Sequence, residues 1–240
     1  MFSTLKHRPL ELIRAAFSWP KFSLTSFVMV SGLKRQGLLP NTVIDVGANV
    51  GQFAVASSKI FPESRVYSFE PNPPCAVQLK KNVSTLGNVT VYELALGETK
   101  GEVEFHVNSH SHSSSILPLA TSHLEAFPDA RESSVIRVEV STLDRVFETV
   151  ELQHPVLLKL DVQGYELQVL LGGRDVLTRV DYVLLEASFK PMYQGEPVFV
   201  DIEKKMREFG FEFLRPVGFL RAPKTGEFLQ MDALFQRRPV

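Results

Sequence analysis

The segment TVIDVGANVG (42–51) decides the fold of this chain. Its first five residues form a short, mostly β-branched apolar run, and Gly47 follows at once. Residues 53–61 then place apolar side chains at approximately helical spacing until Pro62 ends the pattern. The segment therefore predicts a strand, a glycine turn and a helix in direct succession.

The same order of elements recurs along the chain. Residues 76–86 and 167–171 show apolar positions three and four apart, which is typical of helices that follow strands, and a last helix is expected over 198–209. Alternating strands and helices predict a parallel sheet with right-handed crossovers. We expect an α/β fold with a Rossmann-like, doubly wound, mostly parallel sheet and an antiparallel C-terminal strand pair. The expected strands are 42–46, 65–69, 89–94, 155–160, 180–185, 211–214 and 231–235.

The middle of the chain has a different pattern. Residues 101–107 and 135–140 alternate apolar and polar side chains, as strands with one solvated face do. Between them lies a Ser/His-rich stretch that contains NSHSHSSS (108–115). We expect a small antiparallel insertion at about 100–142 that carries a mobile loop, within one domain over residues 41–240.

Composition limits the class of protein. A chain of 240 residues with 44% hydrophobic and 22% charged residues fits one ordinary soluble domain, for which we expect a cytoplasmic location. The single cysteine, Cys75, excludes a disulfide scaffold. A formal net charge of −1 argues against a nucleic-acid partner, because such proteins usually carry a basic excess.

The N-terminal segment, residues 1–40, differs in charge from the rest. It holds six Lys/Arg and one acid, a net charge of +5, which leaves −6 for residues 41–240. The sequence has no run of about 18 apolar residues, so we expect no membrane-spanning helix. We favour a basic helical cap that packs on the domain. The alternative is peripheral contact with an anionic membrane through Phe17, Trp19, Phe22 and Phe27.

Polar residues at strand ends mark the expected ligand site, since open α/β sheets bind ligands outside the carboxyl ends of their strands. Gly47 and Gly51 form a GxxxG turn, whereas dinucleotide-binding proteins use GxGxxG to hold a pyrophosphate. Glu70 ends the second strand, the next one after the glycine turn, where an acid would accept both hydroxyls of a ribose. A ligand with a nucleoside and no pyrophosphate fits this arrangement.

Several motifs occur in the order found in one enzyme family. They are DVGANVG (45–51), FEPNP (69–73), ALG (95–97), STLDRV (141–146), LLKLDVQGYELQVLLGG (157–173) and VLLE (183–186). On these residues the chain resembles the FkbM-type S-adenosylmethionine-dependent methyltransferases over roughly residues 43–215. KLDVQGYE is the most specific block, and Gln163 stands where the family usually has Glu.

This resemblance implies the class I methyltransferase fold, S-adenosylmethionine as cofactor and O-methylation of a hydroxyl. The acceptor would belong to a sugar, a glycan, a lipid-linked saccharide or a secondary metabolite. Gly47, Asn49 and Gly51 would cradle the methionine part, with Asp45 at the base of the turn. The other implied contacts are Glu70 to the ribose, Pro71 and Asn72 beside the adenine, and Asp161 to the amino group or the acceptor.

Proton removal from the acceptor needs a catalytic group. The candidates are Asp161, which follows an apolar strand, and the loop residues His110 and His112, for which a solvated, functionless position is an equal interpretation. Glu186 could accept a hydrogen bond from the acceptor or lie in a salt bridge. Asp161 and Glu186 together could hold Mg²⁺, a less favoured hypothesis.

Other polar residues near the site have simpler interpretations. We favour Glu166 as a first-turn helix acid over a general base, and we interpret Lys159 as structural. Tyr165 and Tyr193 could contact the acceptor, but packing is the favoured interpretation. Two further functions stay open from the residues alone: a nucleotide-cofactor oxidoreductase and a noncatalytic binding domain on the same sheet.

Overall fold

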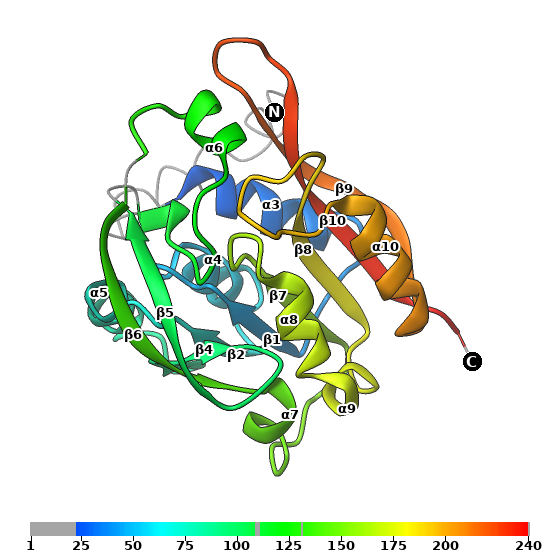
Figure 1. The fold of residues 1–240 in the computed structure, drawn as a ribbon. Coiled ribbons are helices and arrows are strands. Elements are labelled where there is room, and N and C mark those ends of the chain that lie inside the picture. Colours follow the sequence, from blue (N-terminus) through cyan, green and yellow to red (C-terminus); the bar gives the residue numbers. More distant parts are fainter. Residues whose placement is uncertain (1–22, 109–110, 131, 240) are drawn as a thin grey trace.

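The computed structural model describes residues 23–108, 111–130 and 132–239 (Figure 1). His110 and three aromatic residues of the basic segment, Phe17, Trp19 and Phe22, lie outside this range. No helix of the described part is long and apolar enough to cross a bilayer.

A seven-stranded sheet in the order β3-β2-β1-β7-β8-β10-β9 forms the centre of the molecule. Five of its strands are parallel, and β10 runs antiparallel to both β8 and β9. The predicted fold is therefore confirmed, and the strand order reverses between β1 and β7. The strands are β1 (Thr42–Val46), β2 (Arg65–Phe69), β3 (Val89–Tyr92), β7 (Val156–Leu160), β8 (Tyr182–Ser188), β9 (Phe211–Arg221) and β10 (Phe228–Arg237).

Helices cover both faces of this sheet because its buried strands are apolar on both sides. One face packs against α3 (Leu24–Arg35), α4 (Gln52–Ile60) and α5 (Pro73–Val83). The other packs against α7 (Leu143–Val146), α8 (Glu166–Leu171), α9 (Arg174–Leu177) and α10 (Phe199–Glu208). In β1, Val43 belongs to the first layer and Ile44 to the second, as the two-residue period of a strand requires.

The helix α3 is the described part of the basic segment. Ser23 caps its N-terminus by accepting a hydrogen bond from the Ser26 N–H. Phe27, Val30 and Leu33 are buried in the same core as the α4 side chains. The apolar face of α3 therefore packs against the core of the domain.

A second, three-stranded sheet forms the insertion. It contains β4 (Ala95–Leu96), β5 (Gly101–Asn108) and β6 (Glu132–Ser141), and β5 pairs antiparallel with β6 as expected. The described part of the segment between β5 and β6, which we expected to form a mobile loop, has local secondary structure. It contains the 3₁₀ turn η1 (Ser111–Ser113) and α6 (Thr121–Ala126), and the Ser115 hydroxyl donates to the Gln163 carbonyl at 2.7 Å.

Candidate active site

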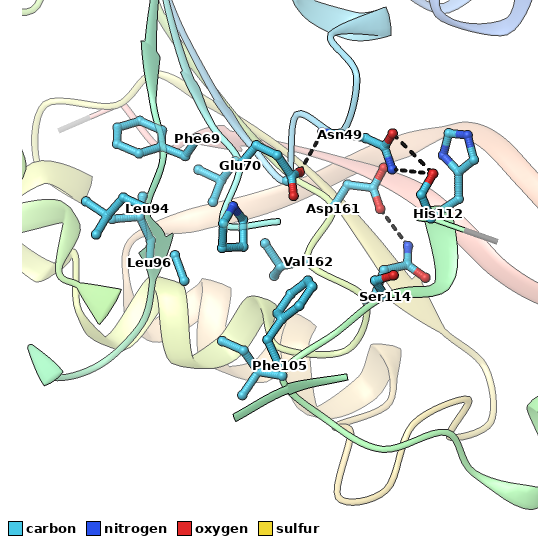
Figure 2. A pocket seen from close by; sticks show the side chains of 17 residues that line it. Asn49, Phe69, Glu70, Leu94, Leu96, Phe105, His112, Ser114, Asp161 and Val162 are labelled. Carbon is cyan, nitrogen blue, oxygen red and sulfur yellow. Dashed lines mark hydrogen bonds between the residues drawn. The ribbon is translucent and has the colours of Figure 1, made fainter. Parts of the chain in front are cut away.

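A cavity with about 590 Å³ of empty space, part of it open to solvent, lies at the carboxyl ends of β1, β2 and β7 (Figure 2). This is the position where the strand order reverses and where such sheets bind ligands. Asn49, Asp161 and His112 lie at one end, and Phe69, Leu94 and Leu96 at the other. The cavity therefore has one polar end and one apolar end.

The glycine turn after β1 is held close to two neighbouring elements. Gly47, Asn49 and Gly51 all have positive φ angles, of 79°, 50° and 95°. A Cβ on Gly47 would lie 1.9 Å from the Asp161 carbonyl oxygen, and one on Gly51 would lie 2.6 Å from Leu79 Cδ1. Gly47 therefore lets the ends of β1 and β7 approach, and Gly51 makes room for α5.

Glu70 joins two loops at the edge of the cavity. Its carboxylate accepts hydrogen bonds from the backbone N–H of Asn49 at 2.7 Å and of Asn72 at 2.8 Å. The side chain is 6% exposed, and burial raises its pKa to about 7, although both N–H donors and Lys159 act in the opposite direction. Each oxygen keeps a further lone pair for a ligand.

Pro71 and Asn72 directly follow Glu70 on this side of the site. Pro71 lines the cavity, and Asn72 is 4% exposed at the start of α5. The Asn72 Oδ1 atom is buried, and no group of the described residues donates to it. Asn72 is not among the described residues that line the cavity, so the structure does not place its side chain in contact with a ligand there.

Lys159 forms the charged floor beneath the turn. Its Nζ lies 3.2 Å from Asp45 Oδ1, 3.4 Å from Asp161 Oδ2 and 3.4 Å from the Gly47 carbonyl oxygen. Burial by itself would lower the pKa of Lys159, but the carboxylates of Asp161 and Asp45 raise it overall. Burial also raises the pKa of Asp45, against the effect of Lys159. The interpretation of Lys159 as only structural missed this contact with the site.

Register explains why Lys159 reaches this position. Asp45 of β1 and Lys159 of β7 are directly paired residues of neighbouring parallel strands, so their side chains emerge on the same face of the sheet. Only the strand pairing shows this contact, because the two residues lie far apart in the chain.

Gln163 lies between the two carboxylates that we considered as a magnesium site. Its Nε2 donates to Asp161 Oδ1 at 2.7 Å and to Glu186 Oε2 at 3.0 Å. Gln230 Nε2 donates to the same Glu186 oxygen at 2.8 Å, and burial raises the pKa of Glu186. An amide nitrogen thus stands where the shared cation would sit, so this donor set does not fit Mg²⁺. Among the described residues, no group of three or more His, Cys, Asp or Glu side chains is arranged to bind a metal ion.

A family model, that of the methyltransferase FkbM domain, matches residues 45–213, which include the glycine turn, Glu70 and the Asp161 segment. This chain belongs to the FkbM methyltransferase family. Two curated FkbM-like relatives are similar in sequence. The 2-O-methyltransferase NoeI of Sinorhizobium fredii is 28% identical over 160 residues, covering 64% of this chain and 66% of that protein. The hexuronic acid methyltransferase AglP of Haloferax volcanii is 29% identical over 143 residues, covering 59% of this chain and 54% of that protein.

A solved structure shares the fold of this FkbM-family chain. PH1948 from Pyrococcus horikoshii, named as a candidate RNA methyltransferase, superposes with a TM-score of 0.52 at 14% identity. The match covers 97% of this chain and 99% of that one. At this identity the likeness concerns the fold alone, which is that of class I methyltransferases.

The turn after Asp161 is stabilised by an acid in this FkbM domain. Glu166 Oε1 accepts hydrogen bonds from the Val162 N–H at 2.9 Å and the Gly164 N–H at 3.4 Å. Burial raises the pKa of Glu166 to about 8. These contacts agree with the structural interpretation of Glu166.

Tyr193 does more than pack. Its hydroxyl donates to Gln163 Oε1 at 2.5 Å and lies 3.3 Å from the Ser113 carbonyl oxygen, and the side chain is fully buried. It thereby fixes the orientation of the amide that binds Asp161. Sequence reasoning missed this role, because Tyr193 and Gln163 belong to separate segments that only the fold brings together.

His112 lies at the exposed edge of the cavity on η1. Its Nε2 is 3.4 Å from Gln52 Nε2, and the neighbouring Ser111 hydroxyl lies 3.3 Å from Asn49 Nδ2. The insertion therefore reaches over the glycine turn and brings His112 beside Asp161 at the polar end. Glu186, in contrast, does not line this cavity and is separated from it by Gln163.

Proposed function

We propose that this protein is an S-adenosylmethionine-dependent O-methyltransferase that methylates a hydroxyl of a sugar or glycan. The observation that carries the proposal is the cavity at the strand switch point, with Glu70 at one wall and the Gly47 turn at its floor. Family membership supports methyl transfer, and both relatives named above are methyltransferases, one of them of hexuronic acid. The chain spans about two thirds of the first relative and about half of the second.

The residues of the cavity fit the proposed cofactor. Ribose hydroxyls are donors, and Glu70 offers free lone pairs at the cavity wall. Phe69, Leu94 and Leu96 provide an apolar surface for the adenine ring. Gly47 and Asn49 then face the methionine part, as the family resemblance implies.

When bound, S-adenosylmethionine supplies a methyl group on a sulfonium, which is already activated for displacement by a hydroxyl oxygen. The protein therefore has to orient the acceptor and remove its proton, and orientation supplies much of the acceleration. Asp161, held by Lys159 and Gln163, orients the acceptor by accepting a hydrogen bond from a hydroxyl next to the reacting one. His112 receives the proton at a ring nitrogen, a step that contributes about 10²- to 10⁴-fold. Glu186 acts indirectly, by fixing Gln163.

Calorimetry of the purified chain tests the cofactor. We expect S-adenosylmethionine and S-adenosylhomocysteine to bind, and NAD not to bind. Binding of NAD alone would support the oxidoreductase, and binding of none of the three would support a noncatalytic domain. Either result would overturn the proposal.

The basic segment receives a separate proposal. We assign residues 23–40 to packing on the domain, since the apolar face of α3 is buried. We therefore expect the full chain to stay in solution when it is sedimented with anionic and with neutral lipid vesicles. Selective sedimentation with the anionic vesicles would instead favour peripheral membrane contact through the basic segment 1–40.

A further inference from the structure

A second cavity, with about 1040 Å³ of empty space that includes open solvent, lies beside the first on the α3 side of the sheet. It is bounded by the N-terminal turn of α3, the turn after β1, and residues of β7, β8 and β10. The two cavities share four lining residues, Gly47, Asn49, His112 and Asp161. A cofactor whose nucleoside occupies the first cavity would therefore present its reactive end to the second.

Part of the wall of the second cavity comes from segments that the family model does not match. Ser23, Thr25, Ser26 and Met29 belong to the α3 region, and Asp232 belongs to β10. All of these lie outside residues 45–213, whereas every residue that lines the first cavity lies inside that range. The first cavity lies wholly within the matched range, so the α3 and β10 residues of the second cavity are where the two cavities differ in their relation to the family.

Asp232 of β10 is the acid that the C-terminal strand pair, β9 and β10, contributes to the described lining of this cavity. It pairs with Glu186 across β10 and β8. A Cβ on Gly218 of β9 would lie 2.3 Å from Asp232 Oδ2, so the glycine leaves space for this carboxylate. Within the described residues, nothing donates a hydrogen bond to Asp232 or forms an ion pair with it. Burial raises its pKa to about 6, and Asp161 acts in the same direction.

The charges of the cavity favour an uncharged ligand. Its lysine, Lys159, is already paired with Asp45 and Asp161, so no cation of the described lining is free to bind a carboxylate of the ligand. Asp161 and Asp232 would repel such a group. The remaining polar lining consists of hydroxyls, amides and His112, and Met29, Phe53 and Leu184 supply apolar contacts. Carboxylates that accept hydroxyl donors beside apolar surface suit a sugar ring without an acidic substituent.

We infer that the second cavity is the acceptor site and that Asp232 binds hydroxyl groups of an uncharged sugar. This inference rests on the proposed function and makes it more specific. It places acceptor selection on α3 and β10, on the opposite side of the shared residues from the adenosine. It also separates this protein from a methyltransferase of hexuronic acids.

Ligand-detected NMR, by saturation transfer, tests the inference on the full chain saturated with S-adenosylhomocysteine. The probes are methyl α-glucopyranoside, methyl α-fucopyranoside and the methyl glycoside of glucuronic acid. We expect signals from at least one neutral probe and none from the glucuronide. Asp232→Asn should weaken the neutral probe about tenfold or more, as expected for loss of a hydrogen bond to a charged group. Ser26→Trp, which fills the cavity, should abolish its signal.

Controls distinguish local effects from misfolding. Glu212→Gln removes an exposed carboxylate from neighbouring β9 and should leave probe binding unchanged. Gly218→Ala should displace the Asp232 carboxylate and weaken the probe without loss of any carboxyl group. All variants should keep the S-adenosylhomocysteine affinity of the parent within about threefold.

Each outcome has a defined meaning. A glucuronide signal as strong as that of the neutral probes, no neutral signal, or a neutral signal unchanged by both Asp232→Asn and Ser26→Trp would overturn the acceptor-site inference. If the parent chain fails to bind S-adenosylhomocysteine, the proposed function itself fails first.

Discussion

The two cavities that meet at Asp161 are built in different ways. The first takes its walls from turns that directly follow β1, β2 and β7 and from the adjacent insertion. The second combines α3 with β10, which lie far apart in the chain. Short strand-end motifs in the sequence can therefore indicate the first cavity. The second cavity forms only when α3 packs on the sheet and β10 pairs with β8.

The polar groups of the two cavities also differ. In the first cavity, Glu70 is fixed by two backbone N–H groups. Asp232 has no such partner among the described residues. A fixed carboxylate suits a cofactor that is always the same, and an unpartnered one leaves its hydrogen-bonding capacity to the acceptor.

The largest effect should come from Gly47→Ala. The new Cβ would lie 1.9 Å from the Asp161 carbonyl, so the ends of β1 and β7 must separate and both cavities lose their common floor. We expect a loss of more than about 3 kcal/mol in the free energy of unfolding and no detectable cofactor binding, measured by urea denaturation and calorimetry.

A matched control isolates the steric part of this effect. Gly37 also has a positive φ, of 84°, but a Cβ there would meet no atom within 4 Å. Gly37→Ala should therefore cost only about 1–2 kcal/mol from backbone strain and leave binding intact. Equal losses in the two variants would show that contact with Asp161 is not the reason for Gly47.

The second-largest effect should come from Asp161→Asn, because Asp161 lines both cavities. We expect turnover of a neutral glycoside to fall about 10²-fold or more, with S-adenosylhomocysteine affinity changed less than about threefold. A radiolabelled methyl-transfer assay and calorimetry provide the two numbers. Normal turnover in this variant would remove Asp161 from the mechanism.

Glu70→Gln tests how much the Glu70 carboxylate contributes to cofactor affinity in the first cavity. We expect cofactor affinity to fall about 10- to 100-fold, since one acceptor of the ribose hydroxyls becomes an amide. The ionised carboxylate is the better acceptor and its pKa is raised to about 7, so the parent's affinity should increase as pH rises from about 6 to about 8. Calorimetry across this range should show a flatter profile for the variant. The same slope in both proteins would assign the titration to another group.

Stability without cofactor should change with pH in the opposite direction. Because the pKa of Glu70 is raised on folding, its contribution is fully present below about pH 4.5 and is lost as pH rises through about 7. The expected decrease is about 3 kcal/mol for this residue. The difference in unfolding free energy between Glu70→Gln and the parent, measured from pH 4 to pH 8, gives this contribution.

The smallest effect should be that of Glu166→Gln. At neutral pH the parent side chain is largely protonated, since burial raises its pKa to about 8, and the Gln oxygen can accept the same Val162 and Gly164 N–H groups. We expect a change below about 1 kcal/mol at pH 6. Stability from Glu166 is lost as pH rises through about 8, so at pH 9 the variant should be the more stable protein. Thermal unfolding at both pH values checks this, with Glu212→Gln as the exposed control.

Sequence alone determined the parallel sheet, the glycine turn and the positions of Glu70 and Asp161 at strand ends. These features are local, because an apolar strand, a glycine and an acid within a few residues already specify a strand end at the ligand edge. The short elements β4, α7 and α9 were not predicted, and β9 and β10 extend beyond their apolar runs because backbone pairing continues where side chains are exposed.

Only the tertiary structure decided which side chains meet. Strand pairing brings Lys159 beside Asp45, folding of the insertion brings His112 to Asp161, and Tyr193 orients Gln163 across the end of the sheet. The same pairing carries Asp232 to the cavity beneath α3. Such contacts depend on the register between strands and on packing between distant segments, and a residue's sequence neighbours contain no information about either.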